Sequence, residues 1–201
     1  MSRIISDRAD KTEHVVVLPA SLEDPNQPVP GLYKLGMLLG CASIFTLFAG
    51  LVAVYIFRAQ SQDHWEPIAL PPILWWSTAL ILASSVPFEI GRRYFRRGER
   101  RIAFRLLTLT TAMGFGFIAC QFTAWRDLVA QGAYMIENPH SALFYIFTGL
   151  HALHLVGGII GLFYVLLKPV RRRETVDIAA YYWHFLGLLW IMLYATLLVV
   201  S

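Results

Sequence analysis

Charged residues are scarce in this sequence, and cysteine is nearly absent. Only 15% of the 201 residues are Asp, Glu, Lys or Arg, whereas 57% are hydrophobic. This composition excludes a disordered chain, and it predicts no nucleic-acid partner because the basic residues lie in loops between apolar runs. Cys41 and Cys120 both lie inside apolar runs. Neither a disulfide framework nor a cysteine-based metal site is therefore indicated.

Motifs that carry enzymatic chemistry are also missing. The sequence has no phosphate-binding glycine loop, no Ser-His-Asp pattern, no paired carboxylates and no redox cysteine pair. It does not show two similar halves with interrupted helices, a pattern found in many transporters. The chain by itself is therefore not predicted to be catalytic.

The sequence does have five apolar runs long enough to cross a bilayer. A hydrocarbon core of about 30 Å needs about 20 helical residues, and a backbone in lipid must satisfy its hydrogen bonds internally. The predicted fold class is all-α: a polytopic membrane protein whose domain, residues 31–201, is a bundle of five transmembrane helices. The expected spans are Leu32–Phe57, Ile73–Ile90, Ala103–Trp125, Ser141–Leu167 and Ile178–Val200.

The loops between these runs predict the orientation of the chain. Residues 1–30 are polar and rich in proline, without the apolar segment of a signal peptide, so we expect a soluble, mobile tail. Basic residues gather after the second and fourth runs, and by the positive-inside rule these loops and the N-terminus face the cytoplasm while the C-terminus lies outside. The residues concerned are Arg92, Arg93, Arg96, Arg97, Arg100, Arg101, Arg105, Lys168, Arg171, Arg172 and Arg173.

Small and polar residues form stripes on two of the expected helices. His151 and His154 are three residues apart and share a helix face, which Gly157 and Gly161 continue. Gly36 and Gly40 have the same spacing in the first run. Because small residues spaced by four let two helices approach closely, we expect helix packing at these four glycines.

Histidines within the expected spans could suggest a metal or a haem. His151, His154 and His184 are candidate ligands, but no Cys, Asp or Glu is placed to complete a site, so no metal is predicted. Hydrogen bonds between helices or contact with a lipid phosphate are the simpler roles. Gln121 is expected to bond a neighbouring helix, and Trp183 to anchor its helix at the membrane interface.

Two segments resemble subunit III of haem-copper terminal oxidases. The stretch from Phe144 to Gly158, with Thr148-Gly149-Leu150-His151, is similar to that family's Thr-Gly-x-His-x-x-His pattern. Tyr182-Trp183-His184-Phe185 is similar to its Tyr-Trp-His-Phe signature. The resemblance runs from about Pro30 to the C-terminus.

The resemblance implies a five-helix subunit III, without the two additional N-terminal helices of seven-helix members, in a bacterial inner membrane. It would pack against subunit I, together with subunit II, in a proton-translocating cytochrome c oxidase of aerobic respiratory electron transport. Haem and copper would belong to the partner subunit, and this chain would hold phospholipid, stabilise subunit I and support proton uptake. The residues expected at a lipid cleft or subunit interface are His151, His154, Trp183, His184 and Gln121.

Three positions depart from the family pattern. Many members have acidic residues where this chain has Ile44, Ala124 and Gly187. A buried carboxylate is the natural proton-handling group in a membrane, so its absence bears on proton uptake. Two alternatives stay open: a subunit III-like accessory of a nitric oxide reductase or quinol oxidase, and an autonomous membrane structural or lipid-binding protein.

Overall fold

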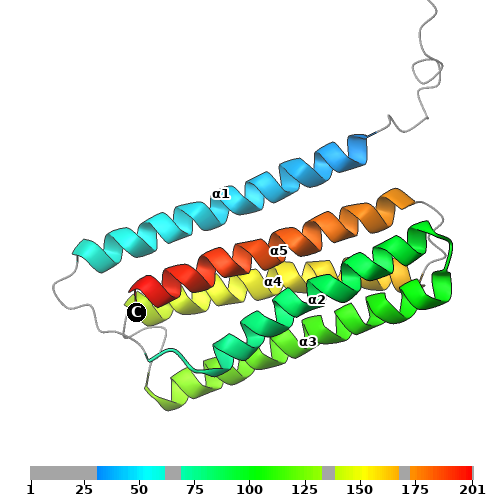
Figure 1. Cartoon of the computed structure of the whole chain (residues 1–201). Coiled ribbons are helices and arrows are strands. Elements are labelled where there is room, and N and C mark those ends of the chain that lie inside the picture. The colour runs from blue at the N-terminus through cyan, green and yellow to red at the C-terminus, as the bar shows by residue number, and fades with distance from the viewer. Residues whose placement is uncertain (1–30, 62–68, 133–138, 168–172, 201) are drawn as a thin grey trace, which may run out of the picture. The chain divides into compact units, whose positions relative to one another are not determined.

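The computed structural model describes residues 31–61, 69–132, 139–167 and 173–200. These residues form five α-helices and no strand (Figure 1). Each helix is long and apolar enough to cross a membrane, which confirms the predicted fold class. The expected tail, residues 1–30, lies outside the described part. The helices are α1 (Leu32–Ser61), α2 (Ile73–Arg96), α3 (Arg100–Ala130), α4 (Pro139–Leu167) and α5 (Arg173–Val200).

Helices α2 to α5 close into a four-helix bundle. Helix α2 packs against α3 and α5, and α4 packs against the same two helices. A tight turn joins α2 to α3: the amide of Arg97 donates to the carbonyls of Arg93 and Tyr94, and Gly98 follows with φ +87°. Glycine suits this position because a side chain disfavours the left-handed region. The turn sends α3 back alongside α2.

The bundle is closely packed where glycines face large side chains. A Cβ built on Gly114 of α3 would lie 2.8 Å from Cη2 of Trp183 on α5. A Cβ built on Gly158 of α4 would lie 3.3 Å from the Leu186 side chain. The missing side chains thus make room for the buried face of α5, including the buried Trp183.

Helix α1 stands apart from this bundle. No Cα atom of α1 lies within 8 Å of a Cα atom in another of the described helices. Only Phe48 and Tyr55 are fully buried on α1. Packed helices usually have axes 8–10 Å apart, so α1 contacts the bundle through long side chains rather than through its backbone.

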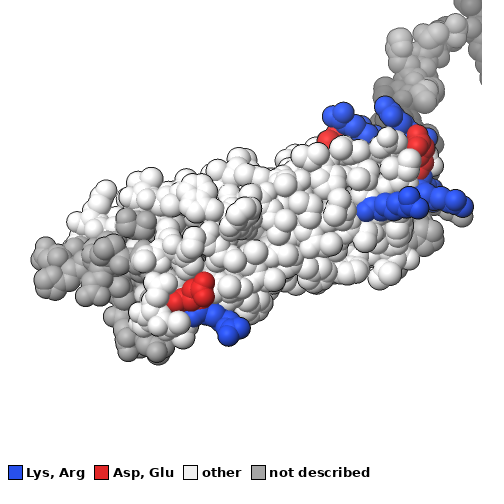
Figure 2. Space-filling view, turned by 60° about the horizontal axis from the view of Figure 1, so that its bottom comes forward, with Lys and Arg blue, Asp and Glu red and all other residues white. Residues whose placement is uncertain are grey.

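Charged side chains occur at the ends of the helices. On the face drawn in Figure 2, Lys, Arg, Asp and Glu lie towards the two ends, and the middle is uncharged. This distribution fits helices that cross a membrane. Which end faces the cytoplasm stays a prediction. Of the arginines that the orientation prediction used, Arg171 and Arg172 lie outside the described residues, and Arg173 begins α5.

Candidate functional site

A groove runs between α1 and the facing sides of α4 and α5. Its volume is about 380 Å³, and its lining is almost entirely apolar. It exists because α1 is held away from the bundle and because α4 presents glycines there. A Cβ on Gly157 would meet only the Tyr182 hydroxyl, at 3.8 Å, and one on Gly161 would meet nothing within 4 Å. Met37, Val165 and Ile178 complete much of its wall.

The groove continues into a more polar recess at the start of α5. This recess has a volume of about 430 Å³ and is lined by Tyr33, Tyr164, Glu174, Thr175 and Ile178. Tyr164, Thr175 and Ile178 also line the groove. The combined space is therefore apolar along the helices and polar where it reaches the helix ends.

Side-chain contacts of Phe48 and Tyr55 join α1 to α4. The Tyr55 hydroxyl and Nε2 of His140 are 2.6 Å apart, in a buried hydrogen bond. Nearer the groove, the ring of Phe48 meets the ring of His154 edge-on, with centroids 5.6 Å apart. Beyond Tyr55, a second groove of about 540 Å³ lies between Ile56 and Gln60 of α1 and the last turns of α5.

Three of the predicted site residues lie inside the four-helix bundle and are fully buried. His151 lies between Phe117 and Trp190, with ring centroids 5.6 and 5.0 Å away. Nε1 of Trp183 donates to Oγ of Ser84 at 2.9 Å, and Nε2 of Gln121 donates to Oγ of Ser77 at 3.2 Å. Bonding between helices was expected of Gln121. The assignment of these three residues to a lipid cleft or subunit interface stays a prediction.

The other two predicted histidines lie outside this core. His154 is partly buried, and its carbonyl accepts a hydrogen bond from the Tyr182 hydroxyl, which lines the groove, at 3.1 Å. His184 lies at the charged end of the bundle, where its Nε2 is 3.9 Å from Oε2 of Glu89. His154 is thus placed beside the groove and His184 beside an ion-pair cluster.

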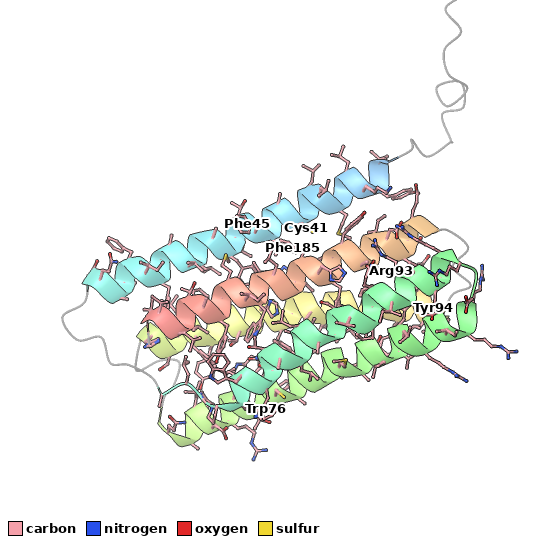
Figure 3. All side chains as sticks on the ribbon, in the orientation of Figure 1. Cys41, Phe45, Trp76, Arg93, Tyr94 and Phe185 are labelled. Carbon is pink, nitrogen blue, oxygen red and sulfur yellow. The ribbon has the colours of Figure 1, made fainter. Side chains whose placement is uncertain are left out.

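This ion-pair cluster fastens α2 to α5. Oδ1 of Asp177 is 2.8 Å from the Arg96 guanidinium and 3.5 Å from that of Arg92. Arg92 also pairs with Glu89 at 2.9 Å, and the more exposed Arg93 pairs with Glu89 at 3.3 Å near the end of α2 (Figure 3). From the sequence, these arginines were assigned a role in orientation only, and neither Glu89 nor Asp177 was identified as their partner. The spacing of Glu89 and Arg92 could have revealed their pair, because residues three apart adjoin on a helix.

Asp177→Asn is expected to lower the free energy of unfolding by about 1–3 kcal/mol, because the nearly buried Arg92 would lose a charged partner. The Asp177 side chain is 12% exposed. Arg93→Ala is the control, since the Arg93 side chain is 70% exposed, and its effect should stay below about 1 kcal/mol. Thermal unfolding of both variants in one detergent compares them. Equal stabilities would contradict a fastening role for Asp177.

The three positions without the family's acids lie on three different helices. Ile44 is half-buried on α1, whereas Ala124 of α3 and Gly187 of α5 are buried. Across the described ranges, no group of three or more His, Cys, Asp or Glu side chains could hold a metal ion.

Five apolar helices with charged ends define a multi-pass membrane protein of the all-α class. Comparison with known proteins narrows this class. A family profile described as Cytochrome c oxidase subunit III matches residues 22–201. The chain belongs to this family, which confirms the resemblance seen in the sequence and supports a subunit III role.

Individual relatives are likewise named cytochrome c oxidase subunit 3. The chain is 30% identical over 184 residues to a probable cytochrome c oxidase subunit 3 of Nocardia farcinica, covering 84% of this chain and 88% of that protein. It is 28% identical over 179 residues to a probable cytochrome c oxidase subunit 3 of Mycobacterium tuberculosis, with the same 84% and 88% coverage. For cytochrome c oxidase subunit 3 of Gadus morhua, the identity is 29% over 191 residues, which are 85% of this chain and 70% of that protein.

Proposed function

We propose that this chain is the non-catalytic subunit III of a haem-copper cytochrome c oxidase in a bacterial inner membrane, where it stabilises subunit I. The observation that carries the proposal is the family match over residues 22–201. The isolated chain also exposes large apolar side chains along α1, among them Leu38 at 66% and Phe57 at 69%. Such surface suits lipid or the helices of another subunit. Haem and copper would reside in that partner.

We further propose that the groove beside α1 holds a phospholipid acyl chain. Its lining is mostly apolar, with hydroxyl groups only at Tyr164, Thr175 and Tyr182, so it suits a hydrocarbon chain better than water. The recess with Tyr33, Glu174 and Thr175 would receive the headgroup, since it lies at the helix ends. A lipid held here would fill the space between α1 and the bundle and so stabilise the position of α1.

Gly157→Leu is expected to displace this lipid without unfolding the chain. The leucine would occupy the groove, because the nearest atom to a Cβ there is 3.8 Å away. Phospholipid retained by the purified complex, measured by mass spectrometry, should fall by half or more. Gly50→Leu is the matched control, since a Cβ at Gly50 of α1 meets nothing within 4 Å and Gly50 does not line the groove. Equal lipid retention in the two variants would contradict the assignment.

Support of proton uptake, which the family resemblance implies, cannot depend on carboxylates at Ile44, Ala124 or Gly187. Any such support would fall to the acidic groups at the Arg-rich end. Among the described residues there, Glu99 and Glu174 are exposed, whereas Glu89 and Asp177 are held in ion pairs. Glu89, Glu99, Glu174 and Asp177 are thus the described acidic residues at this end that could take part in proton uptake.

The absent acids favour a second candidate, an accessory of a nitric oxide reductase. The two candidates predict different reactions for the purified complex. A subunit of an oxidase requires oxygen consumption with reduced cytochrome c as donor. Consumption of nitric oxide but not of oxygen would replace the first proposal with the second, and oxygen consumption with quinol alone would indicate a quinol oxidase.

A further inference from the structure

The core of the four-helix bundle contains polar groups without a hydrogen-bond partner. Gln121 of α3 and His151 of α4 are both fully buried. Within the part of the chain that the structure describes, the Gln121 amide oxygen and both ring nitrogens of His151 have no hydrogen-bond partner. An unsatisfied buried polar group destabilises the folded chain, so these three atoms require an explanation.

These groups lie at nearly the same level of the bundle. Nε1 of Trp125 on α3 donates to Oγ1 of Thr148 on α4 at 2.9 Å, which fixes the register of these two helices. Phe117, two turns earlier on α3, meets His151 with ring centroids 5.6 Å apart. Gln121 lies midway between Phe117 and Trp125 on the same face of α3. Gln121 is therefore buried in the bundle interior at a level between those of Thr148 and His151.

Neighbouring helices supply the walls of this layer. Gln121 is already bonded through its Nε2 to Ser77 of α2, so only its oxygen is in need of a partner. The Trp190 ring of α5 lies against His151, and its Nε1 donates to Thr78. One turn from Trp190, Gly187 is buried, yet a Cβ there would meet no heavy atom within 4 Å. The core is therefore not filled beside Gly187, one turn from the tryptophan that packs on His151.

We propose that an ordered water molecule is bound in this layer between Gln121 and His151. Water fits because the amide oxygen can only accept, whereas a neutral imidazole has one donor and one acceptor whose order depends on the tautomer. A water can donate to Gln121 and either donate to or accept from His151, and buried waters typically make two to four such bonds. A metal cation would lack a carboxylate or thiolate here, since no metal-holding group exists among the described residues.

The bound water would complete a set of polar links around the bundle. Gln121 joins α3 to α2 through Ser77, and Trp190 joins α5 to α2 through Thr78. The water would join α3 to α4 at the same level. All four helices would then be connected in the middle of an otherwise apolar core, whether or not the chain resides in an oxidase.

A cryo-electron microscopy map of the intact complex that resolves ordered waters tests the proposal directly. We expect a density peak within hydrogen-bond distance of Oε1 of Gln121 and of one ring nitrogen of His151. A direct bond between the two side chains, or the absence of a peak in a map that shows other buried waters, would overturn the proposal.

Substitutions give an independent test, which remains informative if one of the variants folds poorly. Gln121→Leu and His151→Phe should each lower the unfolding temperature of the complex, because each strands the other group. The double variant should lower the unfolding temperature by less than the sum of the two single effects, since the loss of the shared water is counted only once. Ser84→Ala, which removes the partner of Trp183, is the control and should be additive with His151→Phe. Additive effects of Gln121→Leu and His151→Phe would contradict a shared water.

Discussion

Gly114→Leu is expected to prevent the folded chain from accumulating in the membrane. A Cβ at this position would already lie 2.8 Å from Trp183 and 3.3 Å from Ile159, so leucine forces α3 away from α4 and α5. Trp183 cannot yield readily, because it is bonded to Ser84 and fully buried. Overpacking of this kind costs about 3 kcal/mol at the upper end of its usual range.

The level of the chain in the membrane fraction, followed by size-exclusion chromatography in mild detergent, measures this effect. Gly36→Leu makes the same replacement on α1, where a Cβ would meet nothing within 4 Å. It should leave a monodisperse chain. If Gly114→Leu accumulated to the level of Gly36→Leu, the close approach of α3 and α5 would be refuted.

Trp190→Ala is also expected to destabilise the chain strongly. Trp190 is fully buried and lies against His151. Its ring packs edge-on against that of Phe117, with ring centroids 4.9 Å apart. Its removal would leave a cavity shared by three helices and deprive Thr78 of a hydrogen bond. Replacing a buried tryptophan with alanine costs about 3–5 kcal/mol.

Trp76→Ala provides the matched control for this prediction. Trp76 lies on the outer side of α2 (Figure 3) and is 74% exposed. Its replacement should change the unfolding temperature of the detergent-solubilised chain little, whereas Trp190→Ala should lower it by many degrees. Similar shifts for the two variants would indicate that Trp190 is not part of a packed core.

The number and order of the helices could be predicted from the sequence, and so could four of their ten ends, Leu32, Ile73, Leu167 and Val200. The other six ends lie beyond the apolar runs. Runs of hydrophobic residues mark the hydrocarbon core, whereas a helix can continue through the interface into water. Helix α2 therefore extends past Ile90 to Arg96, and α3 covers Arg100–Ala130 rather than Ala103–Trp125. The added turns carry arginines, whose long side chains reach polar surroundings.

Neighbours across the bundle were harder to predict. His151 and His154 share a helix face, but three residues place them about 60° apart around the axis. That angle suffices to put His151 into the core against Trp190 and His154 against Phe48 of α1. The pairing of Asp177 with Arg96 joins residues 81 positions apart, which no local pattern encodes.

The spacing of glycines does not by itself say which neighbour a glycine faces. The four glycines expected to pack helices face no close neighbour within the described chain, so their role stays a prediction about lipid or a partner. At four other glycines of the described helices, a Cβ would lie within 3.4 Å of a side-chain atom of a neighbouring helix. The expected set is Gly36, Gly40, Gly157 and Gly161, and the observed set is Gly91, Gly114, Gly116 and Gly158.

A gentle pull-down from native membranes tests whether this chain is a subunit of a haem-copper oxidase. The tagged chain would be solubilised in mild detergent, and its partners examined by mass spectrometry and reduced-minus-oxidised optical spectra. We expect a haem-bearing subunit I to co-elute with the chain, and we expect the eluted complex to consume oxygen. Elution of a stable chain without any haem protein would contradict this expectation.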